Sequence, residues 1–198
     1  AGAASDTFTN FYENFMRQAI RELFRAGDIE GAKAILADLD AKFGTGGIIP
    51  NMGYSKPLEV LVQEWTLGEY EMQPDVARSD VFEALRRGFR EGLLLGRKET
   101  LDEALKFAKD VTDYFKHNRY NDFVNKFGDG RMKDLIGGLE SSVRDVLTFV
   151  ILDRSQPLVD RLIILRNAPE KERREVYDQV RPQLEAEFMA SPLSRSFR

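Results

Sequence analysis

The sequence predicts an all-α protein built from antiparallel helical hairpins, and three observations support this fold class. Apolar residues recur every three or four positions in each periodic segment, which is the spacing of one helix face. Alternating runs of β-branched residues and Asn-Gly turns, which mark strands and β-hairpins, do not occur. Gly, Asp and Pro stand at the ends of the periodic segments, where they stop or start helices.

The first two helices are expected over residues 6–26 and 28–43. Gly27 ends the first helix because glycine readily takes a left-handed conformation, and Asp28 can cap the second. Since only these two residues separate the helices, they must fold back as an antiparallel hairpin. The buried faces are expected to hold Phe8, Tyr12, Phe15, Met16, Ala19 and Leu23 in the first helix, and Ile29, Ala32, Ile35, Leu36, Leu39 and Phe43 in the second.

Residues 44–55 contain four glycines and form the clearest long loop. We expect this loop to pack onto the helices because it carries the apolar side chains Ile48, Ile49, Met52 and Tyr54. A third helix is expected over residues 58–67 and ends at Gly68. Residues 69–78, which include Pro74, are expected to form a connector.

A fourth helix is expected from Asp80 to Gly96, and the capping box Thr100-Leu101-Asp102-Glu103 predicts the start of a fifth. Gly88 and Gly92 lie four residues apart in the fourth helix, and this spacing favours close packing against another helix. The apolar face of the fifth helix is expected to consist of Leu101, Ala104, Leu105, Ala108, Val111 and Phe115.

A long, strongly periodic helix is expected over residues 132–150. Gly137 and Gly138 inside it predict a kink or a close contact with another helix. Two further helices are expected to start at Pro157 and Pro169, because proline suits the first helical turn.

The composition is typical of a soluble globular protein and excludes several kinds of site. The chain has no Cys, which excludes disulfides, zinc–thiolate sites and a cysteine nucleophile. His117 is its one His, which argues against multi-histidine metal sites. The net charge of −4 is spread along the chain, whereas nucleic-acid binding needs a basic stripe. No apolar run reaches the roughly 18–20 residues that span a bilayer, so no membrane span is expected.

Residues 23–36 (Leu-Phe-Arg-Ala-Gly-Asp-Ile-Glu-Gly-Ala-Lys-Ala-Ile-Leu) resemble the middle of a tetratricopeptide repeat. Gly27, Asp28 and Ile29 match the turn between the two helices of that repeat. Ala32 matches the small residue that lets the helices approach each other closely.

The resemblance is best over about residues 8–43. Ile20 and Leu39 depart from it, because they stand where the repeat has small residues, and the proline that ends the repeat is missing. Weaker echoes of the repeat begin at Trp65 and Thr100. The resemblance implies stacked helical hairpins, an α-solenoid, that present a concave surface to a peptide or protein.

We expect one helical domain over residues 1–198. It can be subdivided into tetratricopeptide-like hairpins over residues 1–127 and a less regular C-terminal helical bundle over residues 131–198. The Gly-Asp-Gly sequence at residues 128–130 separates the two parts.

The nearest candidates for acid–base catalysis are the carboxylate pairs Asp38 and Asp40, Asp110 and Asp113, and Asp102 and Glu103. On amphipathic helices such pairs are far more often solvated or capping residues. His117 follows a helix, where a cation complements the helix dipole. Asp129-Gly130-Arg131 indicates a turn, because the other ligands of a calcium loop are not at the required offsets. We therefore assign no catalytic, cofactor-binding or metal-binding residue.

Two other groups could bind a ligand or partner. One is the basic cluster Arg86, Arg87, Arg90, Arg97 and Lys98. Arg86 and Arg90 share a helix face that can grip an anion, but neighbouring glutamates favour a solvated face of mixed charge. The other group is Tyr54, Trp65 and Tyr70, near the glycine-rich loop. Such aromatic residues occur at interfaces, but core positions are more common.

The leading functional hypothesis is a non-enzymatic protein–protein interaction or scaffold module with a protein or peptide partner. The alternative is a helical small-molecule-binding domain or an enzyme whose site is assembled from scattered polar residues. A third hypothesis is an accessory domain of a longer polypeptide. A deep apolar pocket with two convergent titratable groups would favour the alternative. An open concave groove lined by aromatic and polar side chains would favour the interaction module.

Overall fold

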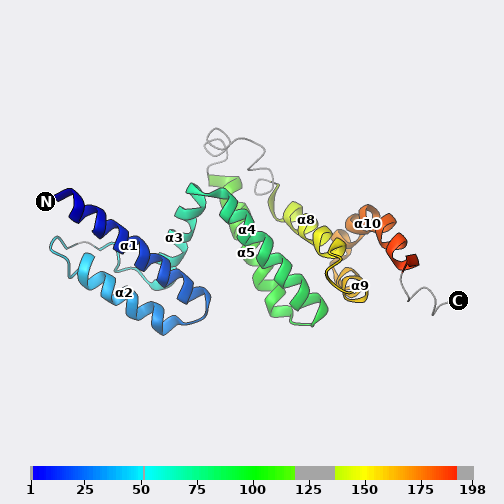
Figure 1. Cartoon of the computed structure of the whole chain (residues 1–198), viewed down its shortest axis with the longest axis horizontal. Coiled ribbons are helices and arrows are strands. Elements are labelled where there is room, and N and C mark those ends of the chain that lie inside the picture. The colour runs from blue at the N-terminus through cyan, green and yellow to red at the C-terminus, as the bar shows by residue number, and fades with distance from the viewer. Residues whose placement is uncertain (1, 51, 119–136, 191–198) are drawn as a thin grey trace. The chain divides into compact units, whose positions relative to one another are not determined.

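The computed structural model describes residues 2–50, 52–118 and 137–190. Within these ranges it contains eight α-helices, one π-helix and no strand, so the all-α prediction is confirmed (Figure 1). The chain forms two compact units, residues 1–72 and 73–198. The subdivision expected near residues 127–131 lies outside the described residues.

The first unit contains α1 (Gly2–Arg25), α2 (Ile29–Phe43) and α3 (Leu58–Met72). Helices α1 and α2 form the predicted hairpin. Gly27 has a φ of +82°, in the left-handed region that ends a helix. The backbone N–H of Gly31 donates to Asp28 Oδ1 over 2.9 Å, so Asp28 caps α2 as expected.

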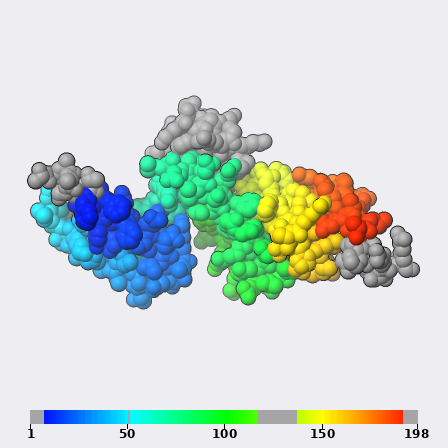
Figure 2. Space-filling view, in the orientation of Figure 1, coloured from blue at the N-terminus to red at the C-terminus, as the bar shows by residue number. Residues whose placement is uncertain are grey.

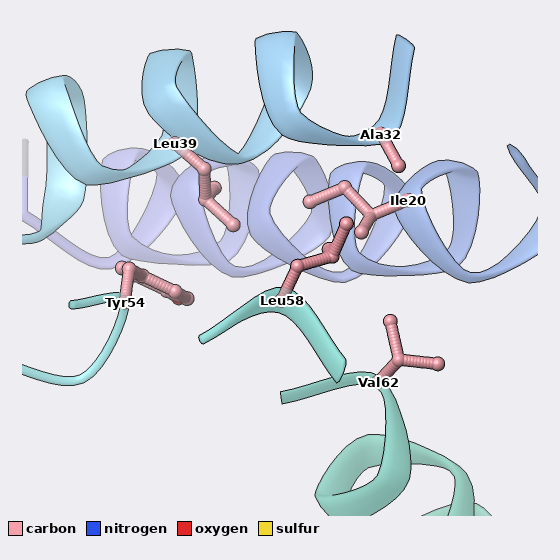
Figure 3. Close-up of a cluster of buried hydrophobic side chains, with 6 residues drawn as sticks. All are labelled: Ile20, Ala32, Leu39, Tyr54, Leu58 and Val62. Atoms are coloured by element: carbon pink, nitrogen blue, oxygen red, sulfur yellow. The ribbon is translucent and has the colours of Figure 1, made fainter. Parts of the chain in front are cut away.

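A small apolar core joins the three helices of this unit. Figure 3 shows its buried side chains directed toward one another, with the Tyr54 side chain coming from the loop that precedes α3. Its members are Ile20, Ala32, Leu39, Tyr54, Leu58 and Val62. Ala32 is completely buried there, at the position where the sequence predicts a close approach of α1 and α2.

Ala32→Leu should destabilise the first unit by about 1–3 kcal/mol, because the added atoms would overpack this core. Trp65 packs against the core and is the one Trp of the chain, so its fluorescence in a urea titration reports on this unit. Ala34→Leu is the matched control, since Ala34 lies exposed on α2. It should change the free energy of unfolding by no more than about 0.5 kcal/mol. Equal midpoints for the two variants would contradict the packing described for Ala32.

Two predictions for the first unit are wrong. Phe8 and Phe15 were expected on the buried face of the first helix, but both are largely exposed. The loop at residues 44–55 does not bury its apolar residues as expected: Tyr54 enters the core, whereas Ile48, Ile49 and Met52 are exposed. Tyr54 anchors the end of the loop. The core is built from side chains of three helices and Tyr54, and it does not include the other apolar side chains of the loop.

The prediction of a connector over residues 69–78 is also wrong. Helix α3 continues through Gly68 to Met72, and α4 begins at once with Pro74 as its first residue. Proline at this position needs no backbone N–H and already has a helical φ. Pro74 therefore starts a helix and does not mark a connector.

The second unit contains α4 (Pro74–Gly88), the π-helix η1 (Phe89–Leu94), α5 (Lys98–Asn118), α8 (Gly138–Leu152), α9 (Leu158–Asn167) and α10 (Glu170–Ala190). Helix α4 packs along α5, both contact α8, and α8 contacts α9 and α10. In Figure 2, α8 to α10 form the continuous yellow-to-red surface. The helices expected to start at Pro157 and Pro169 are confirmed.

The predicted close packing at Gly88 and Gly92 is confirmed. A Cβ atom on Gly88 would lie 2.7 Å from the Cβ atom of Ala104, and one on Gly92 would lie 2.5 Å from that of Leu101. Both distances are shorter than van der Waals contact allows, so only glycine lets this segment lie directly on α5. Gly96, with a φ of +74°, then turns the chain into α5.

Other helix starts differ from the predictions. Helix α5 begins at Lys98, so Thr100 lies inside its first turn and is not the N-cap. Gly137 and Gly138 stand at the start of α8, where Gly138 has a φ of +76°. The glycine pair therefore stands where the described helix begins, and residues 132–136, on the other side of the expected kink, lie outside the described residues.

Candidate functional site

Helix α1 carries three large aromatic side chains on its exposed side. The exposed fractions are 71% for Phe8, 69% for Phe11 and 59% for Phe15. Their spacing of three and four residues places them on one face of the helix. We call these three residues the aromatic face. A contiguous group of exposed large apolar side chains on a packed helix marks an interaction surface more often than a chance arrangement.

Contacts of Tyr12, which lies beside the aromatic face, hold α1 on α2. The Tyr12 hydroxyl donates to Asp38 Oδ2 over 3.4 Å and accepts from Lys42 Nζ over 3.2 Å. The ring of Tyr12 also lies 5.8 Å from that of Phe43. These contacts and Ile20 in the core hold α1 against α2 in a rotation that leaves the aromatic face exposed.

Arg17 anchors the flank of α1. Its Nη2 atom donates to the Tyr54 hydroxyl over 2.6 Å, and the Tyr54 hydroxyl donates to Glu13. The Arg17 guanidinium lies 5.3 Å from the ring centre of Tyr54 and 5.8 Å from that of Trp65, within cation–π range. Burial raises the pKa of Tyr54, and its hydrogen bond to Glu13 adds to the rise. Tyr54 and Trp65 therefore belong to the internal structure of the unit, as does the buried Tyr70 of α3.

Amide side chains lie along one edge of the aromatic face. Asn14 and Gln18 are exposed there on α1. Asp38 and Lys42 contact Tyr12, which neighbours Phe8 and Phe15 on the surface of α1. Glu13 and Arg17 form an ion pair of 3.2 Å on the side of α1 that faces Tyr54. The face therefore offers aromatic area with amide hydrogen-bonding groups along one edge.

The candidate carboxylates have different surroundings in the described structure. Asp38 pairs with Lys42 over 2.6 Å, and Asp113 pairs with Lys109. Asp40 accepts from Thr45 Oγ1 over 2.6 Å and from the Thr45 backbone N–H over 3.1 Å. These two hydrogen bonds lie at the C-terminal end of α2. The exposed carboxylates Asp102, Glu103 and Asp110 lie on α5.

Thr45→Val should raise the pKa of Asp40. Two hydrogen bonds from Thr45 hold that pKa below its usual value, and the bond from the hydroxyl has a larger effect than the bond from the backbone N–H. The variant removes the hydroxyl and keeps the backbone N–H. Because the folded-state pKa is lowered, the stabilisation is present above the unfolded-state pKa and is lost as the pH falls through the folded-state pKa. An NMR titration of the Asp40 carboxyl carbon measures the change. An unchanged titration midpoint would contradict the role given to the hydroxyl.

The basic cluster forms a surface of paired charges. Arg86 lies 2.6 Å from Glu83, and Glu91 lies 3.2 Å from Arg97 and 3.7 Å from Arg87. Arg90 donates to Gln156 Oε1 over 2.7 Å. Arg86 and Arg90 thus have different partners and do not converge on a shared anion site, and Lys98 is exposed at the start of α5.

The remaining sequence candidates lie at the edge of the described structure. His117 belongs to the last turn of α5, but its side chain is not described. Asp129, Gly130 and Arg131 lie outside the described residues. Among the side chains that are described, no group of three His, Asp or Glu residues could hold a metal ion. None of the described helices combines the length and apolar character needed to cross a membrane.

Comparisons with protein-family models, with curated proteins and with solved structures found no significant match. The aromatic face is therefore assigned from its own geometry. Apolar periodicity alone does not reveal this face, because the spacing of Phe8 and Phe15 also fits a helix face shared with Tyr12 and Met16. The available signal was Phe11, an aromatic residue that the proposed buried face left out.

Proposed function

We propose that this protein is a non-enzymatic protein-interaction module and that the aromatic face of α1 binds its partner. The observation that carries the proposal is the exposure of Phe8, Phe11 and Phe15 on one side of a helix whose other side is firmly packed. Covering an exposed phenylalanine is worth about 1.5–3 kcal/mol, so three adjacent ones supply a large part of the binding energy of an interface.

The chemistry of this face indicates what kind of partner it fits. The exposed amides Asn14 and Gln18 lie along one edge of its three aromatic rings. A partner surface that is apolar at its centre, with polar groups around it, would satisfy both the rings and the amides. Because the three phenyl rings carry no charge, their contribution to the affinity should change little with salt concentration.

The tetratricopeptide-like character of the α1–α2 hairpin is part of this proposal. The left-handed Gly27, the capping Asp28 and the buried Ala32 support it, because each has the role that the resemblance implies. A hairpin stiffened in this way holds the aromatic face in a fixed shape. A rigid face loses less conformational entropy on binding than a flexible loop does.

Affinity purification of the tagged full chain from cells of its own source tests the proposal. The double variant Phe11→Gln/Phe15→Gln removes two rings from the exposed side of α1, so the fold should be unchanged. Proteins captured by the wild-type chain should decrease at least tenfold with this variant. Leu95→Gln is the control, because Leu95 is similarly exposed, at 60%, but lies in the other unit.

Two outcomes would contradict the proposal. One is that no protein is enriched by the wild-type chain over an untagged control. The other is that the double variant and the control variant retain the same proteins. Circular dichroism of each variant checks that loss of binding does not reflect loss of structure.

A further inference from the structure

Helix α9 is apolar on two sides. Its inner side is buried and includes Ile164 and Leu165. Its outer side continues the apolar pattern with side chains that remain 36–46% exposed: Val159, Leu162 and Ile163. An exposed apolar row of this kind, added to a complete inner row, is not needed for packing within the described bundle.

A hollow of about 280 Å³ lies beside this outer row, between α9 and α10. Its lining consists of Leu162, Leu165, Arg166, Arg173, Arg174 and Tyr177. We call it the arginine-rimmed hollow. Leu162, Leu165 and the ring of Tyr177 provide apolar surface, and the three arginines place positive charge at its edge.

Two of these arginines have no carboxylate partner in the part of the chain that the structure describes. These two are Arg166 and Arg173, and neither of their guanidinium groups lies within ion-pair distance of a described Asp or Glu. Arg173 Nη1 donates instead to the backbone oxygen of Arg166 over 3.0 Å. Arg174, in contrast, pairs with Glu170. Most other arginines and lysines of this surface have acidic partners, as in the pair of Lys171 with Glu140 at 2.9 Å.

We propose that the arginine-rimmed hollow binds an acidic peptide segment of a partner protein. A large apolar side chain of the segment would enter the hollow, and carboxylates on either side of it would pair with Arg166 and Arg173. Guanidinium groups bind carboxylates through two parallel hydrogen bonds, which orients the segment. The apolar lining favours a peptide over an inorganic anion, because an inorganic anion has nothing to place against the two leucines and the tyrosine.

This inference concerns the second unit and does not depend on the aromatic face of α1. The two sites also differ in their expected response to salt. Binding at the hollow should weaken as salt screens the two ion pairs, whereas the uncharged aromatic face should respond little.

Selection from a random displayed peptide library against the full chain at low salt tests the proposal. The enriched peptides should share a large apolar residue with Asp or Glu on both sides. Arg166→Glu/Arg173→Glu should weaken the affinity for a selected peptide at least tenfold, and Leu162→Ser should also weaken it. Arg86→Glu, the same charge reversal at a surface arginine outside the hollow, should leave the affinity within twofold.

Several outcomes would overturn the proposal. They are a library without binders, enriched peptides without acidic residues, or equal affinity for the double arginine variant and the control. The variant Phe11→Gln/Phe15→Gln separates this test from that of the proposed function. If it loses the selected peptides, they bind the aromatic face and the hollow is not their site. Preserved circular dichroism of the arginine variant is required in each comparison.

Discussion

Arg161→Ala is expected to destabilise the second unit by about 3–5 kcal/mol, which is the largest effect expected among the substitutions proposed for this protein. Arg161 is 1% exposed and is among the largest fully buried side chains of the described structure. A buried guanidinium is tolerated only where several acceptors surround it.

The acceptors come from three successive parts of the second unit. Arg161 Nη1 donates to the Ile151 carbonyl in the last turn of α8 over 2.8 Å, where that carbonyl has no partner along its own helix. Nε donates to the Gln156 carbonyl over 3.1 Å, and Nη2 pairs with Glu187 of α10. Removing the side chain leaves all three oxygens without their donor.

Urea denaturation followed by circular dichroism measures the effect. Arg154→Ala is a matched control, because Arg154 approaches the same Glu187 at 3.8 Å from an exposed position. Exposed ion pairs contribute about 0–1 kcal/mol, so this control should change little. If both variants lost the same small amount of stability, Arg161 would not link the three helices as described.

Gly88→Leu is expected to destabilise the second unit by about 2–3 kcal/mol through overpacking. The side chain would begin 2.7 Å from the Cβ atom of Ala104 and would have to push α4 away from α5. Gly68→Leu is the opposite case, because no atom lies within 4 Å of a Cβ built on that helical glycine. It should stabilise its helix by about 0.5–1 kcal/mol, since glycine is a poor helix former.

Calorimetric or urea unfolding measures the change in the free energy of unfolding for each glycine variant, and the two changes should have opposite signs. Trp65 fluorescence follows Gly68→Leu in the first unit, and circular dichroism follows Gly88→Leu in the second. Stabilisation by both variants would show that α4 and α5 are not in close contact at Gly88.

Local signals of the sequence predicted a large part of the fold. The Gly27-Asp28 turn left two helices no geometry other than a hairpin, and Ala32 marked the point of closest approach. Gly88 and Gly92 predicted a close helix contact from their spacing. In each case the residue type has a conformational or steric property that acts over a few residues and needs no knowledge of the tertiary structure.

The predictions that failed depended on tertiary contacts. Periodicity locates an apolar face but does not show whether a neighbour covers it, so Phe8 and Phe15 were assigned to the core. Proline both ends and begins helices, and Pro74 was taken for a break although it starts α4. The buried role of Arg161 had no signal in the sequence, because its acceptors come from residues up to 26 positions away.

The candidate site also depends on tertiary contacts that the sequence does not reveal. The sequence supported a protein-interaction module over other classes but located no binding face. The aromatic face became visible only when the contacts of Tyr12 and Arg17 fixed the rotation of α1. The arginine-rimmed hollow likewise depends on how α9 and α10 pack, which the spacing within either helix does not determine.

Site-specific photo-crosslinking from position 11 tests the central claim most directly. A photoreactive phenylalanine analogue in place of Phe11 keeps an aromatic ring on the aromatic face, and the same analogue in place of Leu95 serves as the control. Irradiation in cells of the protein's source should give a discrete adduct with a partner protein from position 11 and none from position 95. No adduct from position 11, or the same adducts from both positions, would contradict the assignment of this face as the protein-binding surface.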